Sequence, residues 1–193
     1  MKKSTKQIIL ETAIELFSEL GYTRTSMRII AEKSGITKPA VYYYFPDKES
    51  LFIGILEHGM EEIDKTMQEI ALSDLSTMDK LKAIIRTQIE DMDRHKSFGR
   101  LIMHVLNSNL KENMATRFHE WMSKQSAVLY DIVRQGIEKG EFRKDLDARS
   151  FVYCLTGGMN QFGRDKFHSN NPDIPGNQEK LLFETLIQCA QKV

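Results

Sequence analysis

Three consecutive tyrosines, Tyr42 to Tyr44, stand in the stretch GITKPAVYYYFPDKES, which runs from Gly35 to Ser50. A buried phenol needs a hydrogen-bond partner for its hydroxyl group, and an exposed aromatic ring leaves a large apolar surface in water. Three such side chains in a row are therefore suited to a partner that is flat, polar and charged. Each of them offers that partner an apolar ring and a hydroxyl group at its tip.

The elements that carry these tyrosines are short helices. Apolar spacing and capping residues predict a first helix over about residues 4–21, a second that Gly35 ends, and a third that Thr37 caps. Pro46 disfavours helical geometry at Phe45, so the third helix ends there. Two short helices joined by a tight turn are the pattern of a helix-turn-helix, in which the second helix enters the major groove of DNA.

The first residues of such a second helix face the edges of bases, and here they are Thr37, Lys38, Pro39 and Ala40. Lys38 can donate to the acceptors of guanine, and Thr37 can donate or accept. Pro39 and Ala40 offer apolar contact to the methyl group of thymine. We therefore expect these four residues to contact DNA bases.

The three tyrosines then divide the remaining surface of the helix. Val41 and Phe45 lie four residues apart on one face and should pack on the first helix. A tyrosine ring can lie on the sugar wall while its hydroxyl group donates to a phosphate. Tyr42 is our first choice for that contact, with Tyr44 or Tyr43 the second. The alternative is half-buried packing between helices, and for Tyr43 both interpretations stand.

The distribution of charge says more than its total. The 193 residues carry 27 Lys and Arg against 27 Asp and Glu, which gives a formal net charge of zero. Residues 1–48 nevertheless hold an excess of three positive charges, and the remainder holds the opposite excess. Lys48, at the start of a fourth helix, can meet the DNA backbone with the help of that helix's N-terminus.

The stretch ILETAIELFSELGYTRTSMRIIAEKSGITKPAVYYYFPDKESLF resembles the N-terminal domain of the TetR family of bacterial transcriptional repressors. The resemblance covers about 45 of the 193 residues, and its motifs are specific. The rest of the chain is similar only in architecture. The shared features are Phe-x-x-x-Gly-Tyr at the end of the first helix, Thr25-Ser26 opening the second, Ile30-Ala31, Gly35-Ile36-Thr37, Tyr42-x-Tyr44-Phe45, Lys48 and Leu51-Phe52.

The resemblance implies an all-helical homodimer with two domains, residues 1–48 for the DNA-binding helix-turn-helix and residues 49–193 for ligand binding and dimerisation. The first three helices would bind a double-stranded operator, and the fourth would link the two domains. The last two helices would form a four-helix bundle with the same two helices of the second subunit. Met27 departs from the pattern, since many members carry a polar or β-branched residue there, so a phosphate contact would come from its backbone or from Ser26. The positions at which the family touches DNA are Ser26, Arg28, Thr37, Lys38, Ala40, Tyr42, Tyr43, Tyr44 and Lys48.

Helical patterns fill the rest of the chain as well. The fourth helix continues to about Leu72, and five more follow it. No run of alternating β-branched residues is long enough to predict a sheet, so the expected fold class is all-α. The stretch SNNPDIPGN, residues 169–177, is the clearest predicted loop.

A cavity for a small hydrophobic molecule is expected among the three central helices of the second domain. Methionines adapt to irregular volumes and aromatic rings give broad apolar walls. The resemblance adds that such regulators usually carry a ligand cavity, whereas the alternative is an ordinary core rich in methionine. The residues that would line the cavity are Met92, His95, Phe98, Met103, Met114, Phe118, Trp121, Met122 and Tyr130.

The stretch FVYCLTGGMNQF suits a helix of a dimer interface. Its apolar residues lie at helical spacing, and its two adjacent glycines permit close approach of another backbone. The alternative is a core formed within one chain. The residues assigned to the interface are Phe151, Leu155, Gly158 and Phe162, together with Leu182, Leu186 and Cys189 of the last helix.

Other classes of protein find no support in the sequence. There is no Gly-x-Ser-x-Gly, no phosphate-binding glycine loop and no His-Glu-x-x-His, so no catalytic residue is assigned. The five histidines lack metal-ligand spacing, and we expect neither metal nor cofactor. No apolar run approaches the length of a membrane span. Cys154 and Cys189 are the only cysteines; we expect a reducing compartment, the cytoplasm, and burial of both as small apolar side chains.

The sequence thus predicts a dimeric DNA-binding repressor that a hydrophobic or amphipathic small molecule releases from its operator. Ligand and DNA would then weaken each other's binding equally, because such coupling is reciprocal. Two alternatives stay open. One is a DNA-binding regulator without a small-molecule effector, and the other is an enzyme on the same fold.

Overall fold

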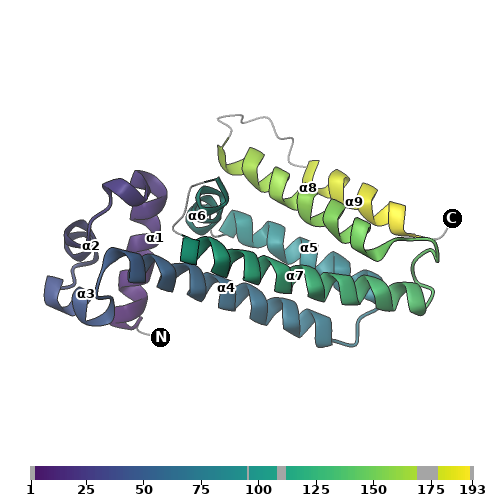
Figure 1. Cartoon of the computed structure of the whole chain (residues 1–193), viewed down its shortest axis with the longest axis horizontal. Helices are drawn as coiled ribbons and strands as arrows, with labels where there is room; N and C mark the ends of the chain where they lie inside the picture. Colours follow the sequence, from purple (N-terminus) through teal and green to yellow (C-terminus); the bar gives the residue numbers. More distant parts are fainter. Residues whose placement is uncertain (1–2, 95, 108–111, 169–177, 192–193) are drawn as a thin grey trace. The chain divides into compact units, whose positions relative to one another are not determined.

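The computed structural model describes residues 3–94, 96–107, 112–168 and 178–191, and within these ranges all regular structure is α-helix. Side chains are not described for the helical residues 93, 94, 102–107, 112–115, 167, 168, 178–180 and 182. The predicted all-α fold class is confirmed for the described part. Its helices (Figure 1) are α1 (Thr5–Arg24), α2 (Met27–Ser34), α3 (Lys38–Tyr44), α4 (Lys48–Leu72), α5 (Thr77–Arg94), α6 (Lys96–Asn107), α7 (Glu112–Glu138), α8 (Ala148–His168) and α9 (Gln178–Ala190).

The chain packs as two compact units. The N-terminal unit comprises Met1–Glu62 and His95–Asn109, and the C-terminal unit comprises Ile63–Arg94 and Leu110–Val193. The division falls inside α4, which begins in the first unit and ends in the second. The expected domain boundary between residues 48 and 49 stays a prediction.

The first helix of the N-terminal unit begins at a capping box. Ser4 Oγ accepts from the main-chain N–H of Gln7, and the Gln7 side chain accepts from the N–H of Ser4. Gly21 takes a φ of 78°, which glycine adopts without steric cost, and kinks the helix. The predicted end at Gly21 is therefore a kink, and α1 continues to Arg24. Its buried face packs against α2 and α6.

The next two helices form the predicted helix-turn-helix. Ser26 begins α2, and its hydroxyl oxygen accepts from the main-chain N–H of Ile29. Gly35 ends α2 with a φ of 68°, and its N–H donates to the carbonyl oxygen of Glu32. Thr37 occupies the N-cap position of α3, which packs against α2. The predicted turn and both predicted cap positions are confirmed.

Val41 and Phe45 hold α3 within the unit, as their spacing predicts. Val41 has no exposed surface, and Phe45 is also buried. Phe45 has left the helical conformation, with a φ of −137° and a ψ of 106°. Its ring lies over Gly54 of α4, where an added Cβ atom would come within 2.9 Å of Phe45 Cε1. The described contact of Phe45 is thus with α4. The expected packing of Val41 and Phe45 on the first helix stays a prediction.

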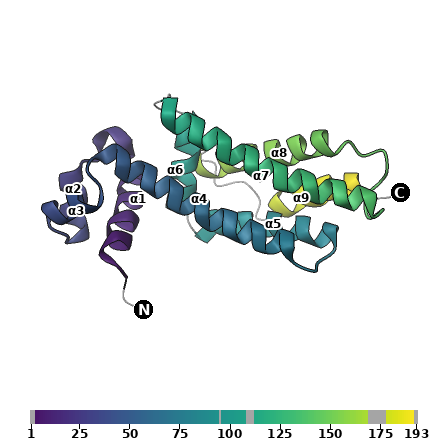
Figure 2. The ribbon, with the colours of Figure 1, turned by 60° about the horizontal axis from the view of Figure 1, so that its bottom comes forward.

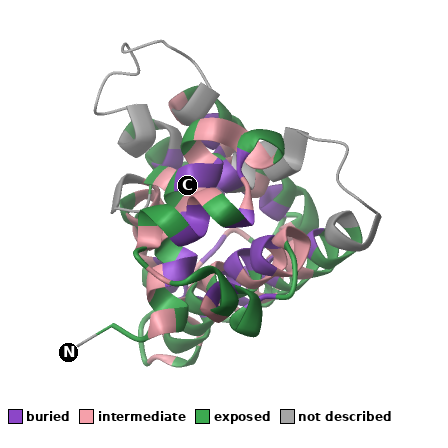
Figure 3. Ribbon diagram, turned by 90° about the vertical axis from the view of Figure 1, so that its left-hand side faces the viewer, coloured by how far each residue is buried: buried purple, intermediate pink, exposed green. Residues whose placement is uncertain are grey.

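In the C-terminal unit, α5, α7, α8 and α9 lie side by side (Figures 1 and 2), with α7 in contact with both α5 and α8. Buried and exposed positions alternate around the helices (Figure 3), as expected for amphipathic helices that share a core. The second part of α4 contributes to the same core. Its fully buried or nearly buried members include Met67, Leu81, Leu129, Val133, Leu155 and Phe183.

The segment after α7 joins three helix ends within this unit. The carboxylate of Glu141 accepts from Thr77 Oγ1 at 2.6 Å and from the main-chain N–H of Met78 at 3.2 Å, at the start of α5. Arg143 Nε donates to the carbonyl oxygen of Cys189 at 2.9 Å, near the end of α9. The Thr77 hydrogen bond, together with the main-chain donors, holds the pKa of Glu141 below its ordinary value of 4.5 despite partial desolvation.

Three further expectations from the sequence concern membrane spans, a loop and the two cysteines. Among the described residues, no helix is both long and apolar enough to cross a membrane. The predicted loop at residues 169–177 lies outside the described residues. Burial of Cys154 and Cys189 was wrong, because both side chains lie on exposed sides of α8 and α9.

Candidate nucleic-acid interface and sensor cluster

The start of α3 is an exposed surface that matches the predicted DNA contacts. Thr37, Lys38 and Pro39 are exposed, and Ala40 is half-buried. The hydroxyl group of Thr37 makes no capping hydrogen bond. The three tyrosines have exposed fractions of 41, 83 and 40% in chain order. We call this the recognition surface, which consists of Thr37, Lys38, Pro39, Ala40, Tyr42, Tyr43 and Tyr44.

The tyrosines of the recognition surface differ in their neighbours. The Lys38 ammonium group lies 5.8 Å from the centroid of the Tyr42 ring. Tyr43 and Tyr44 meet edge to face, with ring centroids 5.3 Å apart. Tyr43 is the most exposed of the three, so half-buried packing does not describe it. Contact of each ring with DNA stays a prediction.

Ser26 and Arg28, which the resemblance also places at DNA, lie at the start of α2. Ser26 accepts a hydrogen bond from its own helix, as described above. Arg28 Nη1 lies 3.0 Å from Glu32 Oε1, and both side chains are largely exposed. An exposed ion pair of this kind stabilises a protein little. Arg28 can therefore exchange Glu32 for a phosphate group at small cost.

Lys48 is held inside the N-terminal unit by groups that sequence reasoning missed. Its Nζ donates to the carbonyl oxygen of Tyr22 at 2.9 Å and to that of Thr25 at 3.0 Å. It also lies 4.3 Å from the centroid of the Tyr22 ring. The end of a helix leaves carbonyl groups without helical partners and favours a cation. Two of the three N–H groups are thus used within the chain, and the phosphate contact of Lys48 stays a prediction.

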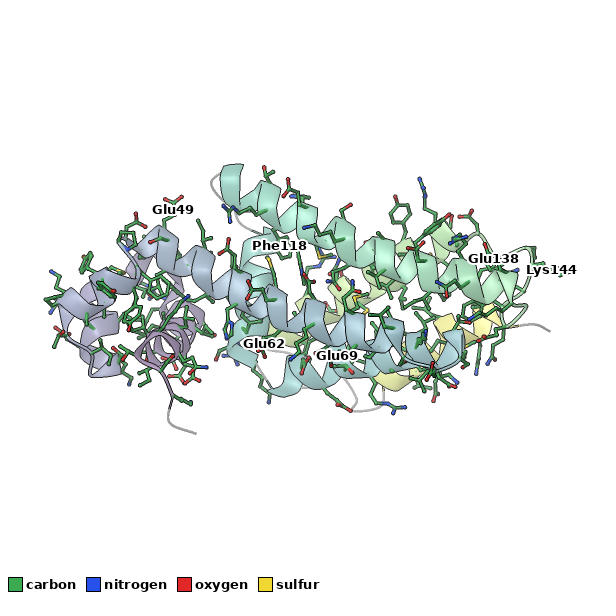
Figure 4. The ribbon with its side chains drawn as sticks, turned by 90° about the horizontal axis from the view of Figure 1, so that it is seen from below. Glu49, Glu62, Glu69, Phe118, Glu138 and Lys144 are labelled. Carbon is green, nitrogen blue, oxygen red and sulfur yellow. The ribbon has the colours of Figure 1, made fainter. Side chains whose placement is uncertain are left out.

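Part of the predicted cavity lining comes together in the C-terminal unit. Phe118 is buried, and its ring centroid lies 5.6 Å from that of Trp121. Trp121 and Met122 are half-buried. Figure 4 labels Phe118 near the start of α7 and Glu138 near the end of the helix.

Other predicted lining residues lie elsewhere. Phe98 of α6 belongs to the N-terminal unit, where its ring fills the space over Gly59 of α4. Tyr130 packs against the core of the C-terminal unit. Met92, near the end of α5, is half-buried. His95 lies outside the described residues, as do the side chains of Met103 and Met114.

Asp64 of α4 contacts two residues of α7. Its Oδ1 accepts from Trp121 Nε1 at 2.7 Å and also from the side-chain amide of Gln125. Trp121 and Gln125 are four residues apart and therefore share a face of α7. Sequence reasoning missed Asp64 and Gln125, although a glutamine inside the apolar stripe of α7 is a usable signal. We call Asp64, Phe118, Trp121 and Gln125 the sensor cluster.

A narrow crevice lies between α4 and α5 in the same unit. Its internal space is about 10 Å³, which is the size that holds one water molecule. None of the residues predicted to line a cavity is in its wall. The wall consists of Ile63, Thr66, Met67, Ile70, Ile84, Thr87, Gln88 and Asp91.

Three of the α8 side chains assigned to a dimer interface are buried within their own chain. Leu155 has no exposed surface, and Phe151 and Phe162 are buried. Phe151 and Leu155 belong to the core of their own chain. Side chains that are this deeply buried within one chain offer little surface for contact with a second chain. The glycine-rich helix carries apolar residues on both sides, so its spacing did not show which side faces outward.

The outward side of α8 and α9 carries other residues. Tyr153 is 65% exposed, and Cys154 and Gly157 are exposed beside it on α8. On α9, Leu181 is 53% exposed and Cys189 is exposed. We call these five residues the outer face. Of the remaining assigned residues, Gly158 and Leu186 are half-buried, and the side chain of Leu182 lies outside the described residues.

Two family models match most of the chain. Residues 9–55 match the model of bacterial regulatory proteins of the tetR family, and residues 74–164 match the model of the Tetracyclin repressor-like C-terminal domain. The chain belongs to the TetR family. It is therefore a DNA-binding transcription regulator, and its recognition surface falls within the first match. Among the described residues of this TetR-family protein, no group of three or more His, Cys, Asp or Glu could hold a metal ion.

Individual relatives agree with this assignment. The chain is 26% identical over 146 residues to the HTH-type transcriptional repressor KstR2 of Rhodococcus jostii (strain RHA1), covering 76% of this chain and 72% of that protein. It is 24% identical over 154 residues to the fatty acid metabolism regulator protein of Bacillus subtilis (strain 168), covering 79% and 78%. Among solved structures, Bacillus subtilis FadR in complex with stearoyl-CoA has a TM-score of 0.82 at 20% identity, covering 95% of this chain and 98% of that one. This last likeness shows the fold.

Proposed function

We propose that this TetR-family protein is a dimeric repressor that a small hydrophobic or amphipathic molecule releases from its operator. The observation that carries the DNA-binding part is the exposure of the recognition surface. Three tyrosines are each exposed by 40% or more, next to Thr37 and Lys38 on the second helix of a helix-turn-helix. Val41 and Phe45 already pack α3 within its unit. The phosphates, sugars and base edges of a major groove would cover the exposed rings.

Selection of an operator from random DNA duplexes, at a stated salt concentration, tests this part. Lys38→Ala should then relax the preference at one base position, by about 1–3 kcal/mol. Lys33→Ala, a change in an exposed lysine of α2, serves as the matched control and should leave that preference in place. Failure to select any sequence, with binding that depends on salt alone, would contradict the proposed operator recognition.

The effector part rests on the relatives and on the sensor cluster. Bacillus subtilis FadR was solved with stearoyl-CoA, which has a long apolar chain and a polar head. We propose an effector of that general kind for this chain, with its apolar part against Phe118 and Trp121. Stearoyl-CoA added to the operator complex should displace the DNA, and operator should weaken stearoyl-CoA binding by the same factor. Free coenzyme A, which lacks the apolar chain, is the control.

Dimerisation is supported by Gly157 on the outer face. An added Cβ atom at Gly157 would find no atom of the described residues within 4 Å, so nothing in that part of the chain requires glycine there. A glycine inside a helix costs about 0.5–1 kcal/mol relative to alanine. Close approach by the same helix of a second copy would account for it. Gly157→Leu should therefore weaken the dimer in sedimentation measurements, whereas Lys124→Leu, a change at an exposed position of α7, is the control.

The proposed release is a shift between two states of the dimer. The chain runs through α4 from the unit that holds the recognition surface to the unit that holds the sensor cluster. An effector that binds one state more tightly shifts the population toward that state. The size of the shift is set by the difference between the effector's affinities for the two states. In the favoured state the two recognition surfaces would not match successive major grooves, which lie about 34 Å apart.

A regulator without a small-molecule effector is the second candidate. The crevice between α4 and α5 has internal space for about one water molecule and is too small for such an effector. Unchanged operator affinity across a panel of acyl compounds would support this candidate. An enzyme on the same fold has no supporting group among the described residues.

A further inference from the structure

Gln125 carries a buried acceptor that nothing in the described chain uses. The residue is 8% exposed and lies on α7 within the C-terminal unit. Its Oε1 is buried and has no hydrogen-bond partner among the described residues. Buried polar groups in native proteins are almost always paired, so each exception calls for an explanation.

Asp64 fixes the orientation of this amide. An ionised carboxylate accepts hydrogen bonds and cannot donate them, so the NH2 group of Gln125 must be the one that faces Asp64. Trp121 Nε1, which can only donate, binds the same carboxylate oxygen at 2.7 Å and holds it in place. Turning the Gln125 amide round would bring two acceptors together. The carbonyl oxygen of Gln125 is therefore committed to the direction away from Asp64.

The surroundings of this acceptor are mostly apolar. Phe118 is buried, and its ring lies 5.6 Å from that of Trp121. Met122, on the same part of α7, is half-buried and adaptable in shape. An apolar wall with one fixed polar group is the usual construction of a site for a small molecule. The carboxylate of Asp64 disfavours an anion beside it.

We propose that Gln125 is a specificity-determining residue that accepts a hydrogen bond from a neutral O–H or N–H group on a largely apolar effector. The inference rests on the proposed effector function and defines the chemistry of the ligand at that site. An ionised carboxylate does not suit the position, because it has no proton to donate and meets the charge of Asp64. An ether of the same shape does not suit it either, because it can only accept.

The test compares three probes that share one apolar chain: decan-1-ol, methyl decyl ether and decanoate. Emission from Trp121, the only tryptophan, reports binding to the full-length chain. The wild-type protein should bind decan-1-ol about five-fold or more tightly than the ether, which is the effect of one hydrogen bond to a buried acceptor. It should bind decanoate more weakly than the alcohol. Equal affinities for alcohol and ether, or no binding of the alcohol, would overturn the proposal.

Two variants assign the preference to Gln125. Gln125→Met keeps the length of the side chain but removes the acceptor, so the alcohol and the ether should bind it about equally. Gln135→Met, a change in another glutamine of α7 that is half-buried, should keep the wild-type preference. A preference that survives in Gln125→Met would overturn the proposal. If that variant does not fold, the wild-type ratio of alcohol to ether still decides the matter.

Operator binding separates this inference from the proposed function. If decan-1-ol and the ether released the operator at the same concentration, the proposed role of Gln125 would be overturned. The proposed effector-responsive repressor would still hold. Failure of the wild-type protein to bind any operator would remove the proposed function. The preference of the sensor cluster for alcohol over ether would still be measurable by Trp121 emission.

Discussion

The ammonium group of Lys48 lies 2.9 Å from the main-chain oxygen of Tyr22, and so joins the first residue of α4 to the end of α1. A second hydrogen bond of 3.0 Å reaches the carbonyl oxygen of Thr25, just before α2 begins. One lysine therefore joins three helices of the N-terminal unit. Its role in stability can be separated by experiment from the contact with DNA that we predict for it.

Lys48→Ala should affect both roles. Loss of two charge-assisted hydrogen bonds at a partly exposed site should lower the free energy of unfolding by about 1–2 kcal/mol. Loss of one phosphate contact should weaken binding to all DNA sequences by a similar factor. It should also reduce the slope of log Kd against log salt concentration by about one. Lys65→Ala, a change in an exposed lysine of the same helix, is the control for both measurements. A lower stability with an unchanged salt slope would mean that Lys48 is purely structural.

Tyr42→Phe should remove one hydrogen bond to a phosphate and leave the fold intact. The expected loss of operator affinity is about 1–2 kcal/mol per half-site, as for a hydrogen bond to a charged group. The melting temperature should hardly change, because the ring is 41% exposed and no hydrogen bond within the chain is described for its hydroxyl group. Tyr130→Phe, which removes a hydroxyl group from α7 in the other unit, is the matched control. Equal losses of stability and DNA binding would mark Tyr42 as a core residue.

Local signals in the sequence were sufficient for the helices and most of their ends, although the predicted end at Gly21 is a kink inside α1. Ser4, Ser26 and Gly35 act on groups only three residues away, so their roles are visible in a short stretch of sequence. The recognition surface followed from the same local pattern. These features needed no knowledge of tertiary packing.

Contacts between distant residues could not be predicted in this way. Lys48 and Tyr22 are 26 residues apart, and Asp64 and Trp121 are 57 apart. Helical spacing relates only residues on the same helix, so it gave no sign of either pair. Helix α8 illustrates a further limit, because Leu155 and Tyr153 both suit an apolar face, yet one is fully buried and the other is 65% exposed. Only the packing of neighbouring helices decides between such faces.

Gly59→Ala should destabilise the N-terminal unit. An added Cβ atom would lie 1.9 Å from Phe98 Cζ, so the ring or α6 must shift. Overpacking of this kind costs about 1–3 kcal/mol, and Phe98 is half-buried, which allows part of the strain to relax. Chemical denaturation of the two proteins measures the difference. Stability equal to or above the wild-type value would show that the Phe98 ring does not occupy this position.

Glu141→Gln should lower stability in a manner that depends on pH. The lowered pKa of Glu141 means that its charged form is favoured in the folded state, chiefly by the hydrogen bond from Thr77. This contribution is fully present above the ordinary value of 4.5 and is lost as pH falls through the lowered pKa. At pH 7 the variant should be less stable by about 1 kcal/mol, since the site is only partly buried. Unfolding measured from pH 7 to pH 3 should show the difference in stability between the wild-type protein and the variant becoming smaller.

Trp121→Phe should alter the response to an effector and spare the operator. The variant keeps an aromatic ring beside Phe118 but removes the N–H group that donates to Asp64 at 2.7 Å. With one donor gone, the carboxylate and the amide of Gln125 are held less firmly. The concentration of decan-1-ol that releases half of a fluorescently labelled operator should therefore rise by about five-fold. Trp121→Ala, which also removes the ring, should abolish or retune the response.

Operator affinity without the alcohol should stay within about two-fold of the wild-type value in both Trp121 variants, because the recognition surface belongs to the other unit. Anisotropy of the labelled operator measures affinity and release in one titration. Lys124→Ala, a change in an exposed lysine of the same helix, is the control and should keep the wild-type response. If both Trp121 variants released the operator at the wild-type concentration of alcohol, Trp121 would be a packing residue. The sensor cluster would then lose its assigned role, because coupling to DNA requires a ligand contact that differs between the two states.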